Sequence, residues 1–328
     1  PKSKLLPEVY LALGDYYFEK YDMIRAKNYY GKILPYKNFE GYPYALYKLG
    51  WTFYNSPVTY DEEQRKNYEN AIKAFKTVVK LSQINPTAEK IGLKNESIKD
   101  LIMVFAEAEK THEAMLYFKS IDSEDSYFMV LERLGWIYND QGKYDKAKDV
   151  YERLIKEAPL RKNIIEMYIK LINVYYLAEN PSMVVTGLRN LINNYFYKLD
   201  WQNKYSDDKE YITSMYKDLE FTLRKYATEF HKYAQETKNK ASFLRAAILY
   251  NSYLRLFPKS EHYYDISYYF ADALFELEKH DLAGYQYMKV VNQNVQGKFF
   301  EISLVQAIYA FNLSLGKKEQ PDSKNMSP

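Results

Sequence analysis

A small residue recurs along this chain with a second small residue twelve positions later, and large apolar residues stand at fixed offsets around both. The clearest copy covers residues 128–159, where Gly135 precedes Ala147 and Pro159 closes the segment. The apolar offsets in this copy hold Leu131, Leu134, Tyr138, Tyr151 and Leu154. This pattern predicts two helices that cannot bury their apolar faces alone, so consecutive copies must stack against one another.

Seven copies of the pattern follow one another. The paired positions are Gly14 with Ala26, Gly50 with Ala71, Ile102 with Ala114, Gly135 with Ala147, Ile172 with Val184, Ala234 with Ala246, and Ala271 with Ala283. The expected copies span residues 7–38, 43–83, 95–125, 128–159, 165–195, 227–258 and 264–295, and a terminal helix spans 299–315. We expect the paired residues to face each other where two helices cross, since close approach of two backbones requires Gly or Ala.

The spacing resembles the tetratricopeptide repeat (TPR), a helix–turn–helix unit of about 34 residues. The resemblance covers residues 7–315 and implies an all-α, right-handed superhelical solenoid of about seven helix pairs plus a terminal helix. Two segments depart from the pattern, the turn of the second copy at residues 57–67 and an insertion at residues 194–210. We expect both to be long loops. The polar tail, residues 316–328, is expected to be disordered.

Composition excludes several kinds of site. The chain has 328 residues, no cysteine, and a formal net charge of +3 from 46 basic and 43 acidic residues. A chain without cysteine has no disulfide and no thiolate metal site, and balanced charge is not typical of nucleic-acid binding. No apolar run approaches the roughly 18 residues that indicate a membrane span. The chain starts at Pro1 without a signal-peptide pattern, so we expect a processed protein or a fragment, with any export signal or lipid anchor outside it.

The sequence offers no catalytic, metal or cofactor constellation. His112, His231, His262 and His280 are scattered, and we interpret each as solvated or partly packed. The string that begins at His112 starts like a zinc-protease helix but lacks the second histidine. Phosphate-binding glycine loops and a Gly-x-Ser-x-Gly nucleophile turn are also lacking. We therefore expect a protein that is not an enzyme and holds no cofactor.

The resemblance implies a concave surface lined by five positions of each first helix. In this sequence those positions hold two lysines, Lys99 and Lys238, and twelve acidic residues: Glu8, Asp15, Glu19, Glu96, Glu107, Glu132, Asp140, Glu166, Asp265, Asp272, Glu276 and Glu301. An acidic groove with aromatic anchors favours a basic or amphipathic segment of a protein partner. The residues expected to bind it are Tyr44, Tyr47, Trp51, Tyr54, Glu132, Trp136, Asp140, Tyr176, Tyr268, Asp272 and Glu276.

Other interpretations of the same residues stay open. The aromatic side chains are also compatible with burial between neighbouring copies, and the acids with a solvated face. A glycan-binding module would stack Tyr and Trp on sugar rings, and a self-association scaffold would use the groove to bind a second copy of the chain. Salt dependence separates the first alternative from a basic peptide, because a neutral sugar binds without strong ionic screening.

Two short strings resemble bacterial envelope proteins of the TPR family. Residues 253–260 read Tyr-Leu-Arg-Leu-Phe-Pro-Lys-Ser, similar to outer-membrane assembly lipoproteins and to periplasmic coordinators of the Tol system. Residues 44–51 read Tyr-Ala-Leu-Tyr-Lys-Leu-Gly-Trp, similar to periplasmic repeat proteins of gliding and predatory deltaproteobacteria. This resemblance implies a scaffold in a bacterial cell-envelope complex, in the periplasm or associated with the outer membrane. The cytoplasm is the alternative location.

Overall fold

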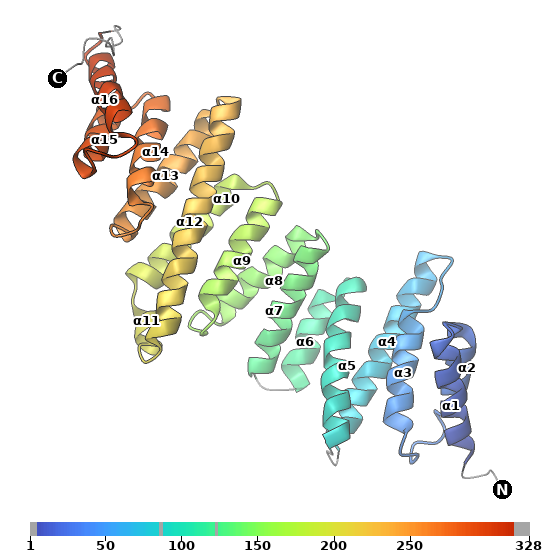
Figure 1. Ribbon diagram of the computed structural model, residues 1–328. Coiled ribbons are helices and arrows are strands. Elements are labelled where there is room, and N and C mark those ends of the chain that lie inside the picture. Colours follow the sequence, from blue (N-terminus) through green and yellow to red (C-terminus); the bar gives the residue numbers. More distant parts are fainter. Residues whose placement is uncertain (1–4, 85–87, 122–123, 318–328) are drawn as a thin grey trace. The chain divides into compact units, whose positions relative to one another are not determined.

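The computed structural model describes residues 5–84, 88–121 and 124–317. Within these ranges the regular structure consists of sixteen α-helices and one π-helical segment, with no strand (Figure 1). This confirms the all-α solenoid class predicted from the repeat pattern. Of the tail expected to be disordered, residues 318–328 lie outside the described residues. The chain divides into two compact units, residues 1–154 and 155–328.

The first unit is a series of helix pairs. Its helices are α1 (Leu6–Glu19), α2 (Met23–Gly31), α3 (Tyr42–Tyr54), α4 (Asp61–Ser82), α5 (Ala88–Glu107), α6 (Thr111–Ile121), α7 (Glu124–Asp140) and α8 (Tyr144–Glu157), and the unit boundary falls inside α8. From α1 to α7, each helix packs against the next one in chain order, and α3 and α5, and α5 and α7, also pack directly. First helices of successive pairs are therefore neighbours, as in a stack of repeats.

The glycines at the helix crossings make room for an aromatic ring of the second helix. A Cβ added to Gly135 would lie 2.7 Å from Cε1 of Tyr151, and one added to Gly50 would lie 2.8 Å from Cε1 of Phe75. Both rings are buried. The atoms nearest to each missing Cβ thus belong to a ring four residues after the paired alanine, on the same face of the second helix. The same relation holds for Gly14, whose Cβ would meet the ring of Tyr30.

The second unit contains helix pairs interrupted by an irregular segment. Its elements are α9 (Ile164–Leu177), α10 (Pro181–Leu191), η1 (Ile192–Tyr197), α11 (Asp200–Lys204), α12 (Lys209–Thr237), α13 (Lys240–Leu256), α14 (Tyr263–Glu276), α15 (His280–Gln293) and α16 (Phe300–Ser314). In the pair of α9 and α10 the small residue has changed helix. Ile172 of α9 occupies the position that holds glycine in other copies, and the glycine is Gly187 of α10. A Cβ added to Gly187 would lie 3.0 Å from Cγ1 of Ile172.

Both segments expected to be long loops are largely helical, so that expectation is wrong. Helix α4 begins at Asp61, and the turn before it is confined to residues 55–60. The insertion at 194–210 is occupied by η1, α11 and the start of α12. Trp201 anchors it, since this side chain is 1% exposed and its Nε1 donates to the carbonyl of Arg161 at 3.0 Å. The extra residues lengthen helices instead. Helices α5 and α12 begin at Ala88 and Lys209, before the expected starts of the third and sixth copies at residues 95 and 227.

Candidate functional site

A groove of about 1040 Å³ lies between α5 and α7 in the first unit. Its lining includes Glu96, Lys99, Asp100, Met103 and Glu107 from α5, Met129, Arg133 and Trp136 from α7, and Gln141 just after α7. We call this cavity the α5–α7 groove. Met129 is 56% exposed and Trp136 is 44% exposed. First-helix positions of two consecutive repeats therefore converge on one cavity that presents large apolar side chains to solvent.

The two cations of the α5–α7 groove are engaged with other lining residues. Lys99 Nζ lies 2.8 Å from Oε1 of Glu96, one turn earlier on the same helix. The guanidinium of Arg133 lies 4.3 Å from the centre of the Trp136 ring, a cation–π contact. Both contacts are exposed and can be replaced by contacts with a ligand at small cost, since an exposed ion pair or cation–π contact contributes at most about 1 kcal/mol. A ligand can therefore displace them.

Gln141, just after α7, bonds to the last residue of α5. Its Nε2 donates to Oε1 of Glu107 at 2.7 Å, which fixes the orientation of the amide because a carboxylate accepts only from the NH₂ side. Its Oε1 is buried and accepts no hydrogen bond from the described residues. A buried acceptor without a donor costs free energy, and because this oxygen is closed to solvent it offers no contact to a ligand in the groove.

Asp100 forms the floor of the α5–α7 groove and was not among the residues expected from the sequence. Trp51 Nε1 donates to its Oδ2 at 2.9 Å, and the hydroxyl of Tyr47 also bonds to it. Burial raises the pKa of Asp100 above its usual range and raises the pKa of Tyr47 to about 12. The only available signal was its place one turn after Glu96. Tyr47 and Trp51, predicted as anchors for a partner, are half-buried, and both bond to the carboxylate of Asp100.

The other predicted residues of the first unit lie outside the lining of this groove. Tyr54 packs edge-on against Trp51 with ring centres 5.5 Å apart. Tyr44 is exposed, and Asp140 is exposed at the end of α7. Glu132 is half-buried on α7. Among the residues predicted to bind a partner, Trp136 is thus the one that the structure places in the groove wall.

In the second unit, Asp272 and Tyr268 contact other residues of that unit. Asp272 Oδ2 lies 2.9 Å from Nε2 of His231, whose Nδ1 lies 3.2 Å from the hydroxyl of Tyr250. His231 is buried, which corrects its interpretation as solvated or partly packed. Tyr268 stacks on Phe299 with ring centres 4.0 Å apart and the planes nearly parallel. These two predicted residues therefore stabilise the packing of the unit.

Tyr176 and Glu276 complete the predicted set in the second unit. Tyr176 is partly exposed on α9, and its ring centre lies 5.2 Å from that of Tyr226 on α12. A hydrogen bond to Glu229 raises the pKa of Tyr176. Glu276 is half-buried at the end of α14. Tyr176 retains exposed ring surface and can still contact a partner.

At least six of the twelve acids expected on the concave surface accept bonds from other described residues. These acids are Asp15, Glu96, Glu107, Glu166, Asp265 and Asp272. Two of them bond to a lysine, Glu96 to Lys99 and Asp265 to Lys298. Charge counted from the sequence therefore overstates the negative charge available to a partner.

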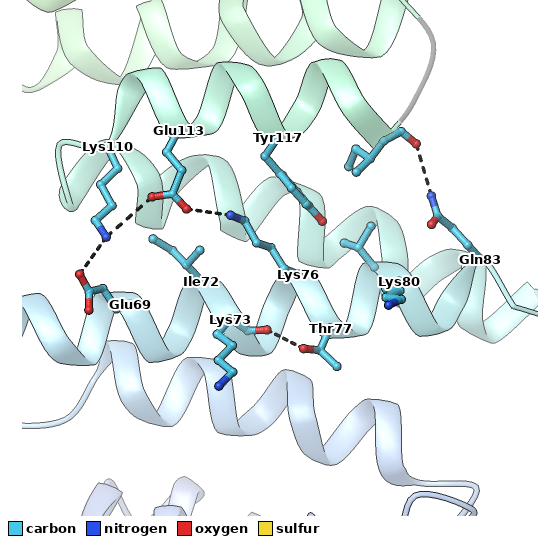
Figure 2. A pocket seen from close by; sticks show the side chains of 12 residues that line it. Glu69, Ile72, Lys73, Lys76, Thr77, Lys80, Gln83, Lys110, Glu113 and Tyr117 are labelled. Carbon is cyan, nitrogen blue, oxygen red and sulfur yellow. Dashed lines mark hydrogen bonds and ion pairs between the residues drawn. The ribbon is translucent and has the colours of Figure 1, made fainter.

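A second cavity in the first unit, of about 530 Å³, lies between the second helices α4 and α6 (Figure 2). Lys76 Nζ lies 2.8 Å from Oε1 of Glu113, and Lys110 Nζ lies 2.9 Å from Oε1 of Glu69. Lys73 points away from both glutamates (Figure 2). Both acids of this cavity therefore form ion pairs with lysines of the same cavity. The sequence did not predict this cavity.

The part of the chain that the structure describes offers no group of three or more His, Asp or Glu side chains placed to hold a metal ion. Among the described helices, none is both long and apolar enough to cross a membrane.

Comparison with known proteins identifies the repeat. The family model of the tetratricopeptide repeat matches residues 44–82 and 130–160, which cover most of α3 with all of α4, and most of α7 with all of α8. TPR repeats are therefore present in this chain, and proteins of this type generally act as protein–protein interaction scaffolds. No curated protein sequence matches the chain.

Several solved structures are similar to the chain at low identity. The MamA protein is 19% identical over 63% of this chain and 97% of its own, with a TM-score of 0.35. The C-terminal part of a TPR repeat-containing protein from Cytophaga hutchinsonii is 13% identical over 89% of this chain and 98% of its own, with a TM-score of 0.34. Yeast Tom70 is 11% identical over 95% and 90% of the two chains, with a TM-score of 0.23.

Proposed function

We propose that this chain is a non-enzymatic scaffold that binds an amphipathic, basic segment of a partner protein in the α5–α7 groove. The observation that carries this proposal is the exposure of Met129 and Trp136 inside a cavity of about 1040 Å³. A large exposed apolar surface within a groove is typical of an interaction site. Tryptophan is enriched among the residues that dominate binding energy, and methionine adapts its shape to different partners.

The charges of the α5–α7 groove indicate the chemistry of the segment. Glu96, Asp100 and Glu107 line it, against Lys99 and Arg133. A Lys or Arg of the partner can replace Lys99 beside Glu96. The apolar face of the segment would cover Met103, Met129 and Trp136 in the manner of a helix laid into a groove. Because the acids exceed the cations by one, we expect only moderate weakening of binding by salt.

The proposal extends to a bacterial cell-envelope complex, in the periplasm or at the outer membrane. Its support is the similarity of residues 44–51 and 253–260 to envelope proteins of the TPR family. Fractionation of native cells, with detection of the chain by antibody, tests this location. Recovery in the cytosolic fraction would overturn it and leave the binding proposal intact.

The binding proposal is tested with arrayed peptides and the purified full chain. One set consists of amphipathic 15-residue helical peptides with Lys and Arg on the polar face, and the matched set carries Glu and Asp there. We expect the basic set to bind, with a Trp136→Ala variant weakened roughly 30-fold, which corresponds to the 2 kcal/mol or more of a dominant interface residue. Fluorescence anisotropy of labelled peptides measures both.

A matched control separates the groove from general surface stickiness. Tyr233→Ala removes a comparably exposed aromatic side chain from α12 and should leave peptide affinity unchanged. Equal loss in both variants, or no loss with Trp136→Ala at intact helicity, would contradict the proposal. Preference for the acidic peptides would also contradict it. Binding of neutral oligosaccharides with no peptide binding would favour the glycan alternative, and concentration-dependent light scattering would favour self-association.

A further inference from the structure

Two segments of the second unit contain basic residues and no acidic ones. Residues 180–199 hold Arg189 and Lys198, and residues 237–260 hold Lys238, Lys240, Arg245, Arg255 and Lys259. No Asp or Glu occurs in either segment, although the whole chain is nearly balanced with 46 basic and 43 acidic residues. The segments contain α10, η1 and α13. One part of the second unit is thus enriched in positive charge.

These segments are neighbours in the fold and enclose a cavity. Helices α10 and α13 pack against each other (Figure 1), and Arg245 Nη2 donates to Oγ of Ser182 at 3.3 Å. Between α10, η1 and α13 lies a cavity of about 340 Å³. It is lined by Arg189, Ile192, Asn193, Tyr197, Ile248, Asn251, Ser252 and Arg255. The lining therefore contains two guanidinium groups, two side-chain amides, two hydroxyls and no carboxylate.

The π-helical segment η1 forms one wall of this cavity. Helices of this type are rare, and they occur frequently at functional sites. Here η1 contributes Asn193, a hydrogen-bond donor, and Tyr197, whose hydroxyl can donate as well. The departure from regular α-helix thus coincides with the polar wall of the cavity.

The two arginines of the cavity carry uncompensated charge. Neither Arg189 nor Arg255 has an ion-pair partner among the residues that the structure describes, and both are exposed. The cavity between second helices of the first unit differs in containing acids, since Glu113 and Glu69 line it and pair with lysines there. A positive cavity without acids therefore does not follow from the repeat architecture alone.

We propose that this cavity binds a dianionic oxyanion of the phosphate class, as the free ion or as the end of a small phosphomonoester. A phosphomonoester carries a charge of about −1.5 to −2 near neutral pH, which matches two unpaired guanidinium groups better than the single charge of a carboxylate does. Planar guanidinium groups bind phosphate through paired N–H donors. Asn193, Asn251 and Tyr197 can supply further donors, and the remaining volume accommodates the group that carries the phosphate.

The site is tested by isothermal titration calorimetry of the full chain with inorganic phosphate and with phenyl phosphate, at constant ionic strength. We expect millimolar or tighter binding and about tenfold weaker affinity for each of Arg189→Gln and Arg255→Gln. Lys198→Gln removes one charge from the same acid-free segment, outside the cavity lining, and should leave the affinity within about twofold. Tighter binding of phenyl phosphate than of phosphate would assign the site to a monoester, and the reverse order to the free ion.

Three results would overturn the proposal. The first is no detectable binding of either ligand by the wild type. The second is equal phosphate affinity in the wild type and both arginine variants. If the variants also unfold at lower temperature, Arg189 and Arg255 only stabilise the C-terminal ends of α10 and α13, where they lie. The third is binding to phosphatidic acid vesicles with no binding of either soluble ligand, which would indicate a membrane-surface patch instead.

Discussion

Gly135 offers the most direct test of how the repeats pack. Replacing it with Ala adds a methyl group 2.7 Å from two carbons of the Tyr151 ring, which is 1% exposed and cannot rotate into solvent. Overpacking of this kind costs about 1–3 kcal/mol, while Ala in a helix interior gains about 1 kcal/mol over Gly. We therefore expect Gly135→Ala to lower the free energy of unfolding by about 1 kcal/mol.

Gly92 provides a control with the same chemical change. It lies inside α5, and a Cβ added there would meet nothing within 4 Å. Gly92→Ala should therefore raise the free energy of unfolding by about 1 kcal/mol, the helix-propensity gain alone. The difference between the two variants, about 1–3 kcal/mol, isolates the contact with the ring. Urea unfolding followed by far-ultraviolet circular dichroism measures both variants in the full chain.

Repeat chains do not always unfold in one step, so a local measurement accompanies the global one. Native-state hydrogen exchange of α7 and α8 should show lowered protection in Gly135→Ala. Adding Tyr151→Leu to this variant should recover part of the loss, because the smaller side chain leaves room for the methyl group. Gly135→Ala as stable as Gly92→Ala, with unchanged protection, would refute the packing argument.

Two further predictions concern Asp100 and Trp201. The pKa of Asp100 is raised by burial, so its contribution to stability is present below about the unfolded value of 3.8 and is lost as pH rises through the folded pKa. Asp100→Asn keeps an acceptor for Trp51 and should lose less stability than wild type as pH rises from 3.8 to neutrality. Urea unfolding midpoints measured across this pH range test this, and parallel plots of midpoint against pH for the two proteins would contradict it. Trp201→Phe removes a buried donor to the carbonyl of Arg161 and should cost about 1–3 kcal/mol in thermal unfolding, whereas Trp136→Phe, at an exposed indole, should cost little.

The fold class could be predicted from the sequence because the constraint is local. A pair of small residues twelve positions apart, flanked by apolar residues at helical spacing, specifies two helices and the faces they bury. Gly135 and Gly50 were correctly assigned to helix crossings on this basis, although the group that requires the glycine is a ring on the second helix. The extra residues at 57–67 and 194–210 were misassigned as loops, since a repeat length counts residues without showing whether they extend a helix.

The candidate site was predicted less well. A position on the first helix indicates which face a side chain occupies, and Trp136 does line the α5–α7 groove. That position does not indicate which residues of the neighbouring repeat bond to the side chain or cover it. Trp51 is bonded to Asp100 of the next pair, and Tyr268 is covered by Phe299. Both contacts join residues at least thirty positions apart, and no local pattern determines them.

The sequence by itself determined the helix pairs, their order and their apolar faces, because these depend on spacing within about 34 residues. Only the tertiary structure decided which aromatic and acidic side chains remain available. Burial and hydrogen bonding are set by the neighbouring pair, and at least half of the acids expected on the concave surface are bonded within the protein. The acid-free cavity at Arg189 and Arg255 likewise arises because two segments with about sixty residues between their centres pack together.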